Sequence, residues 1–500
     1  MMVRLGSRLM LTAFIALLAA AVSGFDFSQI ENKVVEYELD NGLTVLVLPQ
    51  HDVPTAAMIT LVNAGGCDDP KGAAGISHML EHMAFKGTEE IGTTNIEREK
   101  YWMAEEDRIF DLILEERARL DQADSARLAE LDSLFQIATD SASAYVITNE
   151  FGKIYEEEGG VGLNAGTGYD ITMYFAEYPA NRLELWMAME SDRFLSPVFR
   201  SLFQEKQVVA EERRMTREST PQGKLQEEFM AAAFMAHPYG RSLIGPMSDI
   251  QNYNRHVLRD HFSKYYVPSN MAIAIVGDVD PEKVHDLAQE YFGRIPPAPE
   301  PKPVMTIEAE PYGQRTTVVR DQSQPMLFCG FHIPDGDHPD MTAIDAMAKY
   351  LGQGRTSRLH KKLVKEEQIA VYSSAFAGWP GSKYPCLLMF VSVPAKDHTN
   401  TENDEAILEE IEKVKNELIS PEELEKIKAR AKADFINNLK SNKGMAMQLA
   451  YYELVNGDWQ KLFRELDKVN ALTPEDIKRV ANEYLDVDRR IVGLLENVDE

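Results

Sequence analysis

One short stretch decides how the rest of this chain is interpreted. Residues 75–87 read Gly-Ile-Ser-His-Met-Leu-Glu-His-Met-Ala-Phe-Lys-Gly. The pattern predicts a helix over about 73–85, on which His78 and His82 are four residues apart and therefore share one face. Two imidazoles at this spacing can bind one metal ion with bonds of about 2.0 to 2.1 Å. Glu81 lies beside them, where a carboxylate can take a proton from a water molecule activated by the metal.

A catalytic zinc site needs a third protein ligand and an open fourth position. Residues 201–217 predict a second helix, which offers Glu205, Glu211 and Glu212. Glu205 and Glu212 are seven residues apart, two turns along one face, so one can bind the metal while the other supports it. Glu211 points about 100° away and is the weaker candidate. Acidic residues on a solvated helix would be the simpler interpretation if the histidine pair were absent.

Composition and charge place the chain among ordinary globular proteins. It has 500 residues, of which 44% are hydrophobic and 26% charged, and this excludes disordered and collagen-like classes. The net charge of −28 repels a phosphate backbone, so nucleic acid is not an expected partner.

Residues 1–24 are predicted to be a signal peptide. They carry Arg4 and Arg8, then the apolar run 9–22, then small residues, which is the order of a secretory signal. The run 9–22 is shorter than the roughly 20 residues of a membrane span, and no later apolar stretch reaches that length. We therefore expect an exported protein, periplasmic, with no stable membrane span.

The remainder predicts an α+β fold of two similar domains, each a mainly antiparallel sheet with helices packed on it. Five prolines between 296 and 303 mark a linker at 296–304. The order of predicted strands and helices in 25–295 recurs in 305–500. When 344–350 is aligned with 76–82, Ala346, Lys349 and Tyr350 replace the two histidines and the glutamate, so the second domain is expected to bind no zinc.

Residues 100–158 predict a helical hairpin inserted into the first domain. They are rich in Glu, Asp, Arg and Leu, with apolar residues at helical spacing. A solvated helix pair is the simpler interpretation of this charged segment, and a docking arm is the alternative. Surface insertions whose ends stay close disturb a fold little, so the 130 residues between His82 and Glu212 are compatible with one site.

The helix at 75–87 resembles the active-site helix of the pitrilysin, insulinase and mitochondrial-processing-peptidase zinc peptidases, the M16 family. The likeness covers most of residues 34–490 and includes the runs 163–165, 169–172, 205–212, 237–241, 249–250, 266–270 and 276–278. The resemblance implies that one zinc ion is bound by His78, His82 and Glu212. In addition, it implies that Glu81 is the general base and that Glu205 is the supporting acid. It also implies which glutamate binds, because in the family the ligand is the second Glu of the Val-Val-x-Glu-Glu run.

The resemblance implies a zinc-dependent endopeptidase that cleaves unfolded peptides. We expect the strand through Gly162, Leu163, Asn164 and Ala165 to pair with an extended substrate. Two alternatives remain open, a non-catalytic scaffold subunit of the same fold and a zinc hydrolase that acts on small molecules.

The expected partner follows from a departure from the family pattern. Family members complete the site with an Arg and a Tyr from the partner half, but Val364 and Val371 stand at the matching positions. Tyr372 comes one residue late and in a regular strand would face the other side. Because family members enclose peptides between two halves, we expect a homodimer or a sister subunit that lacks the zinc motif.

Overall fold

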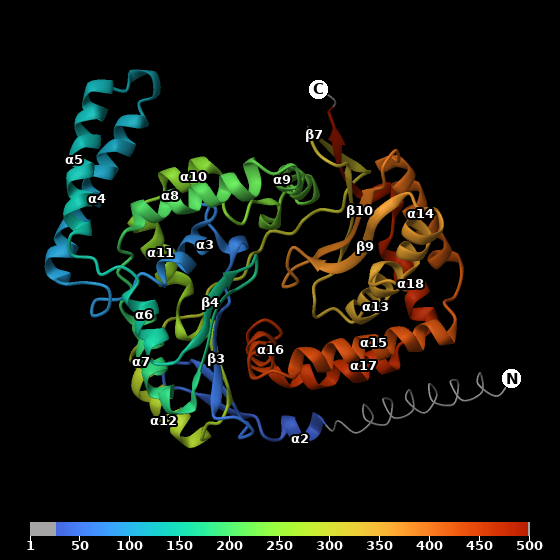
Figure 1. The fold of residues 1–500 in the computed structure, drawn as a ribbon, viewed down its shortest axis with the longest axis horizontal. Coiled ribbons are helices and arrows are strands. Elements are labelled where there is room, and N and C mark those ends of the chain that lie inside the picture. Colours follow the sequence, from blue (N-terminus) through green and yellow to red (C-terminus); the bar gives the residue numbers. More distant parts are fainter. Residues whose placement is uncertain (1–26, 499–500) are drawn as a thin grey trace.

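The computed structural model describes residues 27–498, so the predicted signal peptide at 1–24 lies outside the described residues. Two lobes, each built on a sheet, lie side by side (Figure 1). This confirms the predicted α+β class. Within 27–498, no helix is both long enough and apolar enough to cross a bilayer.

The first sheet has the strand order β1-β2-β6-β3-β5-β4. Only β2 and β6 run parallel, while the other neighbours are antiparallel. Every residue of β6 is buried because helices cover both faces of the sheet at its centre. The strands are β1 Val35–Glu38, β2 Thr44–Pro49, β3 Thr55–Val62, β4 Val161–Thr167, β5 Thr172–Pro179 and β6 Met271–Gly277.

The second sheet repeats this arrangement without the first edge strand. Its order is β7-β11-β8-β10-β9, and only β7 and β11 run parallel. It therefore matches the order β2-β6-β3-β5-β4, as the internal repeat predicted. The strands are β7 Arg315–Asp321, β8 Met326–Ile333, β9 Ala370–Trp379, β10 Cys386–Pro394 and β11 Ile491–Asn497.

The helices of the first lobe include the predicted hairpin, whose two helices α4 and α5 extend away from the body (Figure 1). It begins at residue 96 rather than 100, and α6 is separate from it. The helices are α2 Phe27–Glu31, α3 Ile76–Met83, α4 Ile96–Arg117, α5 Ser125–Ser143, α6 Glu150–Glu157, α7 Leu183–Leu195, α8 Leu202–Arg213, α9 Pro221–Ala233, α10 Met247–Asn252, α11 Arg255–Tyr265 and α12 Pro281–Tyr291.

The second lobe contains several long helices and ends its helical part at Tyr484. A π-helix covers His360–Glu366. The α-helices are α13 Met341–Gly352, α14 Asn400–Asn416, α15 Pro421–Leu439, α16 Asn442–Leu454, α17 Glu465–Ala471 and α18 Pro474–Tyr484.

The two lobes exchange helices, which the sequence did not predict. Helix α9 of the first lobe packs on β7 and β11, where the Phe229 ring lies 5.7 Å from that of Phe328. A Cβ at Gly493 of β11 would stand 2.8 Å from the Phe229 ring, so glycine is needed there. Helix α16 of the second lobe packs on β3 and β6, with Met445 buried in that core. Although 296–314 contains no helix or strand, each lobe therefore completes the core of the other.

The prediction for Tyr372 is wrong. Val371 and Tyr372 are both exposed, at 56% and 52%, instead of alternating. The reason is a β-bulge, because Tyr372 pairs with Val393 while Ala370 pairs with the next residue, Pro394. The extra residue interrupts the alternation of the strand and leaves both side chains on the surface.

Candidate metal centre

Helix α3 is amphipathic, with a buried apolar face and a polar face on the opposite side. Ile76, Met79, Leu80 and Met83 are buried at helical spacing and anchor the helix in the first core. The opposite face carries the two histidines and Glu81, which are only partly buried. The same burial recurs in α13, where Ile344, Met347, Ala348 and Leu351 take the buried positions and Ala346 occupies the place of His78.

The carboxylate of Asp69 fixes the start of α3, and this residue was not identified from the sequence. Buried Asp69 accepts hydrogen bonds from the backbone N–H groups of Gly75 and Ser77, at 2.7 and 3.1 Å, and from Ser77 Oγ at 2.6 Å. Gly75 has φ +88°, and a Cβ there would lie 2.2 Å from Ile244 O. These contacts set the position and rotation of the histidine helix. No local pattern in the sequence marks Asp69, because its contacts depend on the loop that precedes the helix.

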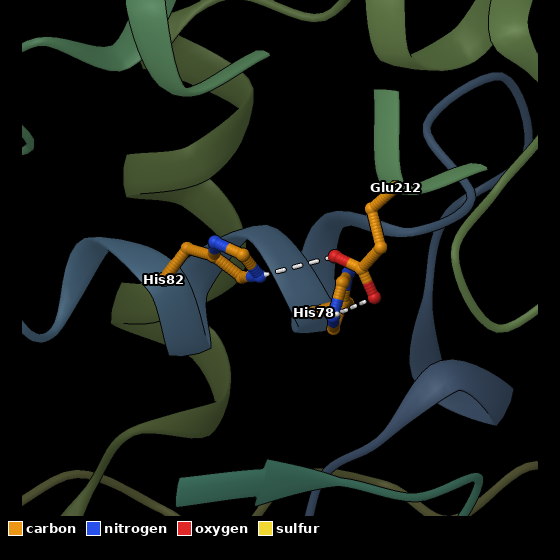
Figure 2. Close-up of side chains that lie close together, drawn as sticks. All are labelled: His78, His82 and Glu212. Atoms are coloured by element: carbon orange, nitrogen blue, oxygen red, sulfur yellow. Dashed lines mark ion pairs between the residues drawn. The ribbon is translucent and has the colours of Figure 1, made fainter. Parts of the chain in front are cut away.

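The structure brings His78, His82 and Glu212 together (Figure 2). His78 Nε2 is 3.7 Å from Glu212 Oε1, and His82 Nε2 is 3.6 Å from Glu212 Oε2. Within residues 27–498, this is the one group of three or more His, Cys, Asp or Glu side chains whose ligand atoms all lie within 4.8 Å of one another. The helix carrying Glu212, α8, packs directly against α3.

The donor set fits a catalytic zinc ion. Two imidazole nitrogens and one carboxylate are a usual three-ligand set. In a tetrahedron with bonds of about 2.0 to 2.1 Å, neighbouring ligand atoms stand about 3.3 Å apart, close to the separations observed here. Glu212 remains 39% exposed, so one side of the group faces solvent and leaves room for a fourth ligand.

Glu205 contacts His82 at the ring nitrogen that does not face Glu212. Its Oε1 lies 2.9 Å from His82 Nδ1 and its Oε2 lies 2.5 Å from Lys86 Nζ. Because a carboxylate only accepts hydrogen bonds, Nδ1 must carry the proton, which leaves Nε2 facing Glu212. Lys86 was not identified from the sequence, because it lies three residues beyond the end of α3, where helical spacing no longer indicates which way a side chain points.

The charges of the group favour a cation between the side chains. Burial opposes a positive charge on His82, yet the carboxylates of Glu205 and Glu212 raise its pKa to about 9. Burial, together with the neighbouring His82, lowers the pKa of His78. The hydrogen bond to His82 lowers the pKa of Glu212. A proton on His82 and a metal ion would compete for the same electron pair.

Glu81 lies beside this group and is held by the neighbouring sheet. Its Oε2 accepts a hydrogen bond of 2.6 Å from Thr167 Oγ1, and Thr167 is the last residue of β4. Thr167 was not identified from the sequence, since a threonine in a strand carries no signal for such a contact. The strand therefore orients the carboxylate that was predicted to be the general base.

The remaining sequence candidates lie as follows. Glu211 turns away to solvent, with 60% of its side chain exposed, and pairs with Arg214. The predicted substrate strand, Gly162 to Ala165, forms part of β4, an edge strand that pairs with β5 alone. The pairing is irregular between Val161 and Asn164, and Gly162 has φ +69°.

Comparison with known families gives two matches that together cover most of the chain. The model described as Insulinase (Peptidase family M16) matches residues 44–122 and 137–247. The model described as Peptidase M16 inactive domain matches residues 252–431. The first match contains α3 and α8, and it leaves residues 123–136 of the hairpin unmatched.

Individual proteins resemble the chain over nearly its whole length. The zinc protease PqqE of Helicobacter pylori is 30% identical over 454 residues, which is 89% of each chain. The crystal structure of a protease from Helicobacter pylori aligns with 93% of this chain and 99% of its own, at 29% identity and a TM-score of 0.77. The periplasmic protease PqqL of Escherichia coli matches in fold, with 16% identity and a TM-score of 0.70, but only 48% of its chain is covered.

Proposed function

Because the chain belongs to the insulinase family of peptidases, M16, we propose that it is a zinc-dependent endopeptidase that cleaves unfolded peptides. The observation that carries this proposal is the convergence of His78, His82 and Glu212 from two helices, with Glu81 beside them. The name of the PqqE relative, a zinc protease, supports the choice of metal.

The roles of the side chains follow from their positions. His78, His82 and Glu212 would hold one zinc ion, which lowers the pKa of a bound water toward about 7 and polarises a carbonyl. Glu81 accepts the proton of the attacking water and then delivers it to the nitrogen of the leaving amine. Thr167 keeps the Glu81 carboxylate turned toward the reacting atoms, and Glu205 keeps the Nδ1 proton on His82.

An extended peptide is the substrate that the neighbouring strand fits. Among the described strands, β4 has only β5 as a partner, so its other edge is open for main-chain pairing. The same strand ends at Thr167, which contacts Glu81, so a peptide paired along Gly162 to Ala165 would pass the general base. In folded proteins most extended segments are already paired within a sheet, so an unfolded peptide fits this edge better.

We further propose that a second chain completes the site, either a second copy or a sister subunit without the zinc motif. Val364 and Val371 provide no polar group for the substrate. The PqqL chain is about twice as long as the part that matches, which is consistent with two such units acting together. The export signal predicted at 1–24, and the similarity in fold to PqqL, a periplasmic protease, support a periplasmic protein.

The deciding experiment is a digest of an unstructured peptide library, read by mass spectrometry. We expect cleavage by the purified chain that a chelator abolishes and added zinc restores. Glu81→Gln should keep zinc and lose cleavage, and Glu211→Gln is the matched control that should keep both.

Each other outcome points to one of the alternatives. Zinc binding without any cleavage would favour a scaffold subunit. Hydrolysis of small esters or amides with no peptide products would favour a small-molecule hydrolase. Full cleavage by Glu81→Gln would refute the assigned base.

A further inference from the structure

A cleft of about 570 Å³ lies where the α4–α5 hairpin meets α8 and α10. Helix α8 contributes Phe203, Lys206, Gln207 and Ala210 to its wall, whereas Glu205 and Glu212 project from the opposite side of that helix toward α3. The cleft therefore lies behind the metal centre and is separate from it. The remaining lining residues are Phe110, Ile113 and Arg117 of α4, Asp132 and Phe135 of α5, and Ile250, Gln251 and Asn252 of α10.

Three aromatic rings form the apolar part of the cleft. The ring of Phe203 lies 4.8 Å from those of both Phe110 and Phe135, and these two are 5.8 Å apart. Ile113 and Ile250, both buried, extend the same surface. Such a surface favours an aromatic or aliphatic body.

Two cations line the cleft without a carboxylate partner. Lys206 is 4% exposed, and its Nζ donates hydrogen bonds of 2.8 Å to Gln251 O and Tyr253 O and lies 4.3 Å from the centre of the Phe110 ring. Among the described residues, no carboxylate lies within 4 Å of its ammonium or of the Arg117 guanidinium. Burial and the nearby Arg117 and Arg255 lower the pKa of Lys206 to about 7.

Neighbouring buried cations, by contrast, are paired. Arg255 contacts Glu106 at 2.8 Å and also Asp107, and Arg200 contacts Glu99 at 2.8 Å. These fully buried pairs join the base of the hairpin to the body, so the wall it supplies is preformed. In the part of the chain that the structure describes, Lys206 has no such carboxylate partner, and an anion bound in the cleft beside it would supply the missing negative charge and favour its protonated form.

We propose that this cleft binds an amphipathic organic anion, a carboxylate or sulfonate carried on an aromatic or aliphatic body. The anionic group would lie at Lys206 and Arg117, and the body would lie on the three phenylalanines. Asp132 is the one carboxylate in the lining, so the positive charges outnumber the negative. The two lining residues of α5, Asp132 and Phe135, fall in residues 123–136, which the match to the insulinase family model leaves out.

Two fluorescent probes with the same ring system test the proposal on the purified full chain. 8-Anilinonaphthalene-1-sulfonate carries the anion, and N-phenyl-1-naphthylamine lacks it. We expect one sulfonate probe per chain, bound at least tenfold more tightly than the neutral probe, although the net charge of −28 repels it. Equal affinity for the two probes would overturn the proposal.

Two kinds of variant distinguish the contribution of the two cations from that of the apolar space in the cleft. Arg117→Gln should weaken binding of the sulfonate probe about threefold, as expected for the loss of an exposed ion pair. Lys206→Met should weaken it more than tenfold. Gln207→Trp, at an exposed position on the cleft, should exclude both probes without unfolding the chain. Arg127→Gln removes the same charge from a hairpin residue that does not line the cleft and should leave the affinity for the sulfonate probe unchanged.

The result does not depend on peptidase activity, since no zinc ligand lines the cleft. If Arg117→Gln and Gln207→Trp remain folded by circular dichroism and bind the sulfonate probe like the wild type, the cleft is not its site. Equal weakening by Arg127→Gln would likewise overturn the proposal.

Discussion

Replacing Glu205 by glutamine should weaken zinc binding about tenfold, or about 1.4 kcal/mol. The carboxylate is largely buried and bridges His82 Nδ1, at 2.9 Å, and Lys86 Nζ, at 2.5 Å. The amide keeps the volume, and its oxygen can still accept the hydrogen bond from Nδ1–H of His82, but it lacks the negative charge that makes Nε2 of His82 a stronger metal ligand. Residues that support a metal ligand in this way are worth 10- to 100-fold in affinity, and a conservative change belongs at the lower end.

Competition with a chromophoric chelator measures this affinity directly. The matched control is Glu211→Gln, the same change on the same helix at a side chain that is 60% exposed and paired with Arg214. We expect the control to bind zinc like the wild type. Unchanged affinity in Glu205→Gln, or equal losses in both variants, would refute the supporting role of Glu205.

Three further outcomes follow from the contacts around α3. Lys86→Met should lower zinc affinity severalfold by releasing Glu205, and Lys86→Arg should restore most of it, as measured in the same competition assay. Thr167→Val should keep zinc and reduce kcat about tenfold in peptide cleavage, because Glu81 loses its hydrogen bond, whereas Thr167→Ser should stay near the wild type. Burial lowers the pKa of His261 to about 3, so the folded chain binds fewer protons there than the unfolded chain, and stability falls as the pH drops below about 6.5. Between pH 6.5 and 5, the free energy of unfolding of His261→Gln, measured with urea, should fall by about 2 kcal/mol less than that of the wild type.

Local spacing was sufficient to find the residues that converge on the candidate metal centre. His78, Glu81 and His82 follow from one helical turn, and Glu205 and Glu212 follow from two turns of another. Helical periodicity fixes which side chains share a face, so these positions can be read without a structure. That the two faces meet came from the family resemblance, since spacing within one helix says nothing about its neighbour.

The contacts that the sequence missed join one helix to residues outside it. Asp69 reaches α3 from the loop six to eight positions earlier, and Thr167 reaches Glu81 from a strand 86 positions away. The exchange of α9 and α16 between the lobes is of the same kind, because an amphipathic helix does not reveal which sheet it covers. The bulge at Val371 is local, but nothing in its composition distinguishes it from a regular strand.

The position of a bound metal tests the account most directly. Crystals of the zinc-loaded protein, measured on both sides of the zinc absorption edge, give an anomalous map that locates the ion without assumption. We expect one ion per chain, about 2.0 to 2.1 Å from His78 Nε2, His82 Nε2 and a carboxylate oxygen of Glu212, with one position open to solvent. An ion held by Glu211 or at another place in the chain, or no ion at saturating zinc, would contradict it.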